Sequence, residues 1–266
     1  MAIHLQSVRV HFGGIEVLRS ITLKIEAGER VAILGPSGAG KSTLLRLLNG
    51  SVRPSEGDVY VLGRRIDQLG PRRLRGVRRE TGTISQSLDL AGPLRVVHNV
   101  NAARLGAWST ARALVSLVSP RGATEVANAL ESVGLAGFED RRTDQLSGGE
   151  QQRVAVARVL CQQPRLILGD EPTASLDPEW SHRILALLTS RDNESRNPAI
   201  GRPPAGAALK RDDRTVVLSL HSPDDARAFA DRIVGIRAGK VCLDRPASAV
   251  SDDDLVALYA QPSASS

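Results

Sequence analysis

Two kinds of pattern predict an α/β fold with a helical segment inserted into it. The runs RLILGDE (residues 165–171) and TVVLSLH (215–221) are continuously apolar, as in strands buried on both faces of a parallel sheet. From about Leu88 to Gln145, apolar residues instead recur at spacings of three and four, which favours helices. We therefore expect an α/β core that helices interrupt.

The first part of the chain predicts strands and one helix. VRVHF (8–12) alternates, GGIEV (13–17) leads through a turn into a strand, and ERVAILG (29–35) is a short apolar run. A helix is expected to follow from Lys41 to about Asn49, where Gly50 ends it.

The remaining elements follow in order. GDVYVLG (57–63) predicts a strand, residues 102–118 and 122–134 predict helices, and RIVGIRAGKVCLD (232–244) predicts a closing hairpin. Residues 190–214 are polar, rich in Pro, Gly and Ala, and without a period, so a flexible surface loop is expected there.

Composition narrows the class of protein. Two cysteines in 266 residues are too few for a disulfide framework, which fits a reducing compartment. The first residues lack the apolar core of a signal peptide, and no uncharged apolar stretch approaches the ~18 residues that a membrane-spanning helix needs.

The net charge of +6 raises the question of an anionic partner. The densest basic run, GPRRLRGVRRE (70–80), contains Arg72, Arg73, Arg75, Arg78 and Arg79. Lipid headgroups or RNA would suit it, but a solvated helix face is the simpler interpretation, and no aromatic residue is interleaved for base stacking.

GPSGAGKST, Gly35 to Thr43, matches the phosphate-loop pattern and lies between an apolar strand and a helix. Glycines allow backbone N–H groups to converge on a polyanion, and the helix directs its positive end at the phosphates. Lys41 is expected at the β- and γ-phosphates, and the Ser42 hydroxyl on Mg²⁺. The expected nucleotide-binding residues of the loop are Gly35, Pro36, Ser37, Gly38, Ala39, Gly40, Lys41, Ser42 and Thr43.

An acidic pair ends the buried strand of RLILGDE. Asp170 fits a water-bridged Mg²⁺ role because its carboxylate is a hard oxygen donor. Glu171 is then placed to orient or deprotonate an attacking water, a task worth roughly 10²–10⁴-fold. Beside a phosphate loop, this pair predicts a nucleoside triphosphatase.

LSGGEQQRVAVAR (146–158) begins an otherwise good helix with two glycines, each costing about 1 kcal/mol relative to Ala. Together with the two motifs above, LSGGE resembles the signature of the ATP-binding subunits of ABC transporters, and the resemblance covers nearly the whole chain. In that family two subunits close head to tail around two ATP molecules. Ser147, Gly148, Gly149 and Glu150 then correspond to the group that caps the γ-phosphate held by the opposite subunit.

The resemblance implies further residue roles. Phe12 corresponds to the aromatic residue that stacks on adenine, and Gln86, after Ser85 where the family usually has Phe, to the residue that links Mg²⁺ and water to the membrane subunit. Asp177 corresponds to the residue that communicates across the dimer, and His221 to the histidine that contacts the γ-phosphate.

The resemblance also implies an architecture and partners. The fold would be a P-loop NTPase core with an N-terminal antiparallel β-subdomain and a helical subdomain at 88–160, all within one nucleotide-binding domain of residues 1–266. ATP and Mg²⁺ are the expected ligands. A homodimer on two transmembrane permease subunits, served by a solute-binding protein, would lie peripherally on the cytoplasmic face of the inner membrane, without nucleic acid.

LLRLLNGSVRPSEGDV (44–59), NAARLGAWSTARAL (101–114) and HSPDDARAFADRIVGIRAGKV (221–241) resemble the phosphonate-import branch most closely. The first hypothesis is therefore an ATPase that drives uptake of phosphonate or a related phosphorus oxyanion. An importer of another solute, such as polar amino acids, is one alternative. A soluble ABC ATPase that binds nucleic acid through the arginine run is the other.

Overall fold

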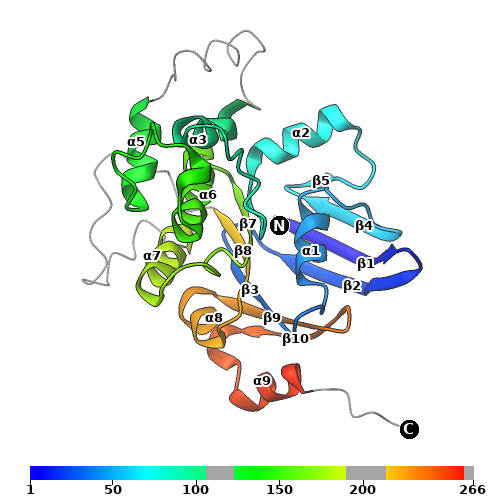
Figure 1. The fold of residues 1–266 in the computed structure, drawn as a ribbon. Coiled ribbons are helices and arrows are strands. Elements are labelled where there is room, and N and C mark those ends of the chain that lie inside the picture. The colour runs from blue at the N-terminus through cyan, green and yellow to red at the C-terminus, as the bar shows by residue number, and fades with distance from the viewer. Residues whose placement is uncertain (106–122, 190–213, 261–266) are drawn as a thin grey trace. The chain divides into compact units, whose positions relative to one another are not determined.

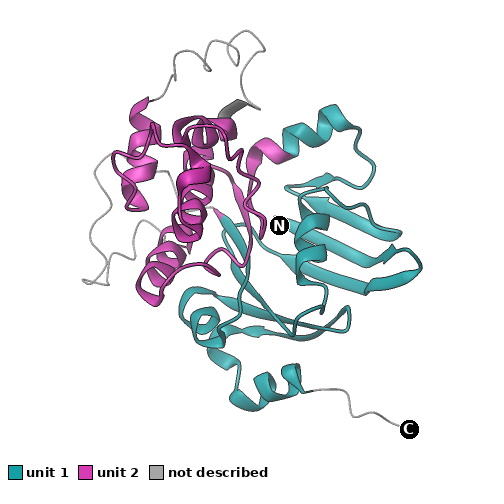
Figure 2. Ribbon diagram, in the orientation of Figure 1, with its two compact units in different colours: residues 1–77, 215–266 teal, residues 78–214 magenta. Residues whose placement is uncertain are grey.

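The computed structural model describes residues 1–105, 123–189 and 214–260. The chain divides into two compact units, which Figure 2 distinguishes by colour. Unit 1 comprises Met1–Val77 and Thr215–Ser266, and unit 2 comprises Arg78–Arg214. Within the described residues, no helix is both long enough and apolar enough to cross a membrane.

The first half of unit 1 forms an antiparallel sheet (Figure 1). Its strands are β1 (Ile3–Phe12), β2 (Ile15–Ile25), β4 (Glu56–Val61) and β5 (Arg64–Arg65), in the order β2-β1-β4-β5. Alternate residues of β1, such as Ile3 and Leu5, are fully buried. The predicted N-terminal antiparallel β-subdomain is therefore confirmed.

Unit 1 also holds a mainly parallel group of strands. β3 (Arg30–Leu34) lies between β8 (Thr215–Ser219) and β9 (Arg232–Arg237) and is parallel to both, and β10 (Lys240–Pro246) closes an antiparallel hairpin with β9. All five residues of β8 are buried, as its continuous apolar run predicted. The helices of unit 1 are α1 (Lys41–Leu48), α8 (Pro223–Phe229) and α9 (Asp252–Tyr259).

Unit 2 combines a parallel strand pair with helices. β6 (Thr81–Ile84) pairs with β7 (Leu166–Asp170), and α3 (Val96–Leu105) and α5 (Ala123–Ser132) pack on α6 (Gly148–Gln162). A short 3₁₀ turn (Thr143–Gln145) precedes α6, and α7 (Pro178–Thr189) follows β7. The division between the units falls within α2 (Pro71–Glu80).

The structure refines several expected boundaries. The helix predicted from Lys41 to about Asn49 spans Lys41–Leu48, and Gly50 follows with a φ of 71°. α3 begins at Val96, before the expected 102, because Val96, Val97 and Val100 bury one side of an earlier helical turn. The rest of that prediction, residues 106–118, lies outside the described residues, as do residues 190–213 of the expected loop. The segment 88–160, expected as a subdomain, lies inside unit 2, which also includes β6, β7 and α7.

Candidate functional site

The phosphate loop connects β3 to α1 in unit 1. Gly35 and Gly40 have φ values of 148° and 108°, and a Cβ on either residue would collide with the unit's own strands. It would lie 2.0 Å from the Ile236 carbonyl oxygen at position 35 and 2.8 Å from Leu18 Cδ2 at position 40. These glycines are therefore needed for packing as well as for an approaching polyanion.

Gly38, by contrast, faces open space. Its φ is 76°, and no atom of the described residues lies within 4 Å of an added Cβ. A left-handed glycine at an open position fits a backbone cradle for an anion. Helix α1 then starts at Lys41 with no acidic residue in its first turn, so its N-terminal N–H groups and dipole favour a bound phosphate.

The Lys41 side chain lies buried inside this loop. Only 6% of the residue is exposed, and Nζ donates to the carbonyl oxygens of Gly35 at 2.7 Å and Pro36 at 3.1 Å. An ammonium group at this depth must be compensated, and here carbonyl oxygens contribute to that compensation. Ser42 and Thr43 follow at the helix start, each half-buried.

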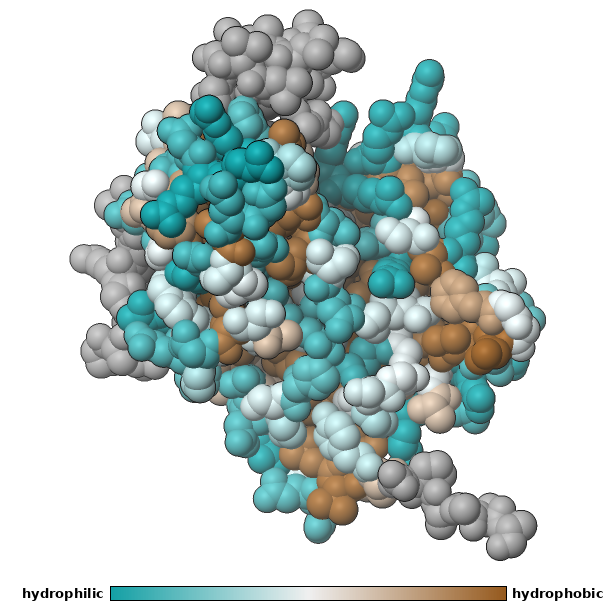
Figure 3. Space-filling model, in the orientation of Figure 1, coloured by the Kyte–Doolittle hydropathy of each residue, from teal (hydrophilic) through white to brown (hydrophobic). Residues whose placement is uncertain are grey.

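Two other predicted residues of unit 1 are exposed. Phe12 ends β1 with 47% of its surface accessible, opposite Ile15, which is 71% exposed. A brown patch in Figure 3 lies over this end of the β1–β2 hairpin. Phe12 is thus available for stacking rather than a core residue. His221 is also exposed, and the bond from Leu220 N to Ile33 O at 3.1 Å anchors the segment that carries it.

In unit 2, β7 delivers the acidic pair. All five residues of β7 are buried, and Asp170 at its end is 7% exposed. Glu171 follows half-buried with a φ of 53°, a left-handed conformation that costs a non-glycine residue of order 1–3 kcal/mol. Gln152 Nε2 donates to its carbonyl oxygen at 3.4 Å. A strained backbone at a predicted catalytic carboxylate is a functional indicator in its own right.

Gln86 lies in an exposed turn directly after β6. The two residues that close this turn, Leu88 and Asp89, have φ values of 61° and 48°. The Arg158 guanidinium of α6 donates to both of their carbonyl oxygens at 2.7 Å. The turn that presents Gln86 is therefore fastened to the helix that begins with the signature.

The signature forms the N-terminus of α6. Ser147 is the N-cap: its Oγ accepts from Glu150 N at 3.3 Å, while the Glu150 carboxylate accepts from Ser147 N at 2.8 Å and from Ser147 Oγ at 2.8 Å. Hydrogen bonds from the Ser147 backbone and then its hydroxyl lower the pKa of Glu150. The carboxylate at position 150 thus completes a capping box.

Ser175 and Leu176 lie against this helix start. A Cβ on Gly149 would be 3.0 Å from the Ser175 carbonyl oxygen, whereas one on Gly148 would be 3.9 Å from Ser175 Cβ. Asp177 Oδ1 accepts from Trp180 N at 2.9 Å and so caps α7. Unit 2 therefore places the signature beside the segment that leads to Asp177.

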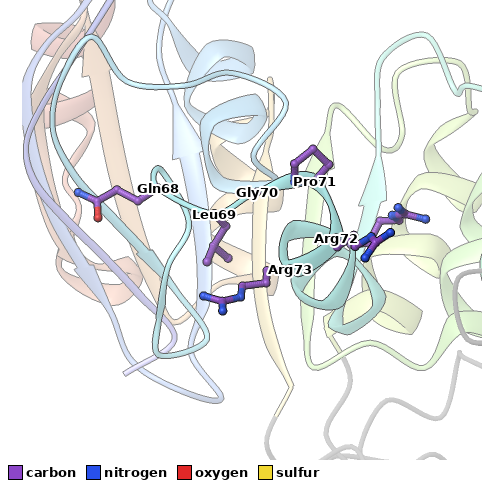
Figure 4. A pocket seen from close by; sticks show the side chains of 7 residues that line it. Gln68, Leu69, Gly70, Pro71, Arg72 and Arg73 are labelled. Atoms are coloured by element: carbon purple, nitrogen blue, oxygen red, sulfur yellow. The ribbon is translucent and has the colours of Figure 1, made fainter.

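The basic run forms helix α2, and its five arginines are exposed, as a solvated helix face predicts. A cavity of ≈ 570 Å³ beside its first turn is lined by Gln68, Leu69, Gly70, Pro71, Arg72, Arg73 and Arg75 (Figure 4). None of the predicted nucleotide-binding residues lines it. This cavity is therefore separate from the predicted phosphate loop.

Sequence reasoning missed two residues. Arg158 could have been noticed as the one charged residue in the apolar stretch VAVARVL. Tyr259 of α9 lies near the phosphate loop: burial raises the pKa of its hydroxyl, and a hydrogen bond from the Gly35 backbone opposes that rise. No sequence pattern connects Tyr259 to Gly35.

Comparison with known proteins identifies the family. The family model described as ABC transporter matches residues 18–174. The chain is 41% identical to the phosphonates import ATP-binding protein PhnC 3 of Halalkalibacterium halodurans, over 94% of this chain and 90% of that protein. The chain belongs to the ABC transporter ATP-binding family.

Other relatives of this ABC protein carry the same description. The chain is 47% identical to the phosphonates import ATP-binding protein PhnC of Anaeromyxobacter dehalogenans over 93% of its length, but it spans about half of that relative, 46%. It is 40% identical to the PhnC protein of Pseudomonas fluorescens, covering 94% of this chain and 88% of that one.

Solved ABC cassettes share the fold. The dimeric post-hydrolysis state of an ATP-binding cassette bound to ADP and Pi superposes with a TM-score of 0.73 at 30% identity, over 92% of this chain and 98% of that one. The cbiO1 protein of Clostridium perfringens, part of the ABC transporter complex cbiONQ, gives 0.71 at 25% identity, over 96% and 93%. The predicted α/β fold of the ABC type is therefore confirmed.

The predicted Mg²⁺ ligands of the two units are each of a chemical type that Mg²⁺ prefers. Among the described residues, no group of three or more His, Cys, Asp or Glu side chains could hold a metal ion by itself. Unit 1 offers the Ser42 hydroxyl, and unit 2 offers the Gln86 amide and the Asp170 carboxylate. All three carry hard oxygen atoms, and Mg²⁺ typically combines one or two such ligands with water and substrate phosphates.

Proposed function

We propose that this chain is the ATP-hydrolysing subunit of an importer that takes up a phosphonate or a related phosphorus oxyanion. The phosphate loop supports the ATPase part: a buried Lys41 at the start of α1, in a loop with left-handed glycines, suits the phosphates of a nucleotide. The relatives named as phosphonates import ATP-binding proteins support the substrate class.

In this proposal the residues of unit 1 bind ATP. Phe12 stacks on the base, which explains its exposure. Lys41 Nζ exchanges its two loop carbonyls for β- and γ-phosphate oxygens, and His221 contacts the γ-phosphate. Backbone N–H groups from Gly35 to Thr43 surround the phosphates.

The residues of unit 2 carry the hydrolytic step. Glu171 accepts a proton from the attacking water, and Gln86 orients that water. Mg²⁺, held by Ser42, Gln86 and, through water, Asp170, would neutralise charge on the phosphates. The left-handed backbone of Glu171 fixes the direction in which β7 presents its carboxylate.

A second copy of the chain completes the proposed catalytic unit. Ser147, Gly148, Gly149 and Glu150 of one copy would cap the γ-phosphate held by the other, and Asp177 would communicate between copies. The dimeric cassette bound to ADP and Pi supports such an assembly. The dimer would work peripherally on the cytoplasmic face of the inner membrane, on two permease subunits served by a solute-binding protein.

The Glu171→Gln substitution tests the ATPase. The variant keeps the shape of the side chain but lacks the base, so ATP turnover should fall at least ~100-fold while ATP binding persists and ATP-dependent dimers accumulate. Glu179→Gln, an exposed residue of α7 paired with Arg183 at 2.8 Å, is the matched control and should hydrolyse ATP normally. Normal turnover by Glu171→Gln would remove Glu171 from the mechanism.

Uptake of a labelled alkylphosphonate by host cells carrying Glu171→Gln tests the substrate. Labelled phosphite, phosphate and glutamine are measured in parallel, with wild-type cells as reference. Selective loss of phosphonate uptake supports the proposal. Loss of glutamine uptake alone would favour a polar amino acid importer. ATPase stimulation by RNA, lost on neutralising the arginines of α2, would favour the nucleic-acid alternative.

A further inference from the structure

The turn that carries Gln86 has an unfavourable backbone. Leu88 and Asp89 are consecutive residues with left-handed φ values of 61° and 48°, a conformation that crowds any side chain with a Cβ. Within the turn, Leu88 N donates to Ser85 O at 2.9 Å and Ser87 Oγ donates to Asp89 Oδ1 at 2.9 Å. Two such residues in succession persist only where their surroundings hold them.

Arg158, which lies outside the turn, stabilises it by hydrogen bonds. It lies on α6, and its two terminal nitrogens donate at 2.7 Å to the carbonyl oxygens of Leu88 and Asp89, one to each. A planar guanidinium matches two neighbouring acceptors as no ammonium group can. Arg158 itself is half-buried, and burial lowers the pKa of its guanidinium while the negative charge of Asp89 opposes that effect.

A second tie lies just beyond the turn. The Asn99 amide accepts from Ala91 N at 2.8 Å and donates to Ala91 O at 3.0 Å and to Thr143 Oγ1 at 2.8 Å. Thr143 is buried and also donates through Oγ1 to Leu94 O at 3.0 Å. Thr143 precedes the signature by only a few residues, so the segment after Gln86 is bonded to the chain that enters α6.

We infer that Arg158 is the positioning residue of Gln86. By holding the carbonyl groups of Leu88 and Asp89, Arg158 sets the orientation of the turn that presents Gln86. The same hydrogen bonds attach this turn to the signature helix α6 (Figure 1). This inference rests on the proposed function, in which Gln86 orients the attacking water. Arg158 acts through Gln86 and does not itself touch ATP.

The first test measures ATP turnover and binding by the purified full chain. Arg158→Gln should lower kcat about tenfold or more while the Kd for ATP changes less than about twofold, because the phosphate loop is left intact. Arg158→Lys, which keeps the charge but not the planar pair of donors, should fall between wild type and Arg158→Gln. The control is Arg165→Gln, which removes an exposed ion pair with Glu80 at 3.1 Å and should leave kcat unchanged.

The second test asks whether Arg158 acts through Gln86. In a double-mutant cycle, Arg158→Gln combined with Gln86→Ala should be no slower than Gln86→Ala alone. Hydrogen exchange at the amide of Leu88 should accelerate about tenfold in Arg158→Gln, while exchange in α1 stays unchanged. Additive losses in the cycle, or wild-type exchange at Leu88, would overturn the inference.

The two proposals fail in different ways. If the wild-type chain hydrolyses no ATP, the proposed function fails, and the exchange rate at Leu88 still decides whether Arg158 holds the turn. If the wild type hydrolyses ATP and Arg158→Gln does so at the same rate, the role assigned to Arg158 is wrong while the ATPase stands. Thermal unfolding of both Arg158 variants shows whether any loss reflects global unfolding instead.

Discussion

Gly149 of the signature lies against the carbonyl group of Ser175, so that a Cβ at position 149 would be 3.0 Å from that oxygen. Gly148, one residue earlier, has its nearest such neighbour at 3.9 Å. The two glycines that begin α6 are therefore small for different reasons. Gly148 leaves room for an approaching ligand, whereas Gly149 is also required for close packing against Ser175.

The stabilities of Gly148→Ala and Gly149→Ala should therefore differ. Replacing a helical Gly with Ala gains up to about 1 kcal/mol, so Gly148→Ala should unfold at equal or higher denaturant concentration than wild type. Gly149→Ala must displace the Ser175 carbonyl and should be about 1–2 kcal/mol less stable than Gly148→Ala. Urea unfolding of both variants measures this difference, and equal stabilities would contradict the packing argument.

Phe12 should affect nucleotide affinity more than stability. Since 47% of its surface is exposed, Phe12→Ala should lower the free energy of unfolding by only about 1–2 kcal/mol, less than truncation of a fully buried Phe. Loss of stacking should weaken ATP binding by about 1–3 kcal/mol, which titration calorimetry measures. Phe12→Tyr is the control and should bind ATP as wild type does. A Phe12→Ala protein with wild-type affinity would exclude Phe12 from the base site.

Glu150 should make stability depend on pH. The Ser147 backbone, and then its hydroxyl, lower the pKa of the Glu150 carboxyl below its ordinary 4.5 in the folded chain. A lowered folded pKa adds stability that is fully present above the unfolded value and is lost as the pH falls through the folded value. The stability advantage of wild type over Glu150→Gln should therefore narrow between about pH 5 and pH 3. An advantage that is constant over this range would show that the carboxylate adds nothing to the cap.

Gly134 should be far less tolerant of alanine than Gly137. Both have positive φ, 69° and 79°, so both variants carry backbone strain. Only at Gly134 would the new Cβ meet a side chain, 2.2 Å from Trp180 Cη2. Gly134→Ala should thus lose about 1–3 kcal/mol more than Gly137→Ala and alter tryptophan fluorescence, because the Arg153 guanidinium, 4.3 Å from the Trp180 ring, must move as well. Equal losses of stability in the two variants would mean that backbone strain alone, and not the clash with Trp180, destabilises Gly134→Ala.

Local patterns were sufficient for the strands, the phosphate loop and the signature helix. The apolar run at 166–170 predicts a buried strand, and the glycine-rich loop that ends at Lys41 predicts where α1 begins. Both predictions depend only on interactions between residues close together in the sequence. The hold of Arg158 on Leu88 could not be predicted in this way, because it joins residues 70 positions apart. The neighbours of Gly149 and Tyr259 were missed for the same reason: tertiary packing decides which distant segments meet. The catalytic roles of Gln86, Asp170, Glu171 and His221 stay predictions until the variants are measured.

The hydrogen bonds of Lys41 also affect the anion selectivity that we expect of the phosphate loop. Its ammonium group donates to Gly35 O and Pro36 O at 2.7 and 3.1 Å, so an anion that binds it competes with these two acceptors. Chloride offers a single diffuse charge, whereas a triphosphate offers several oxygen atoms that could take the place of the carbonyls and also accept from the loop amides. Occupancy of this loop would then be a competition between the protein's own carbonyl oxygens and the anion. On this basis we expect the loop to bind a triphosphate in preference to chloride.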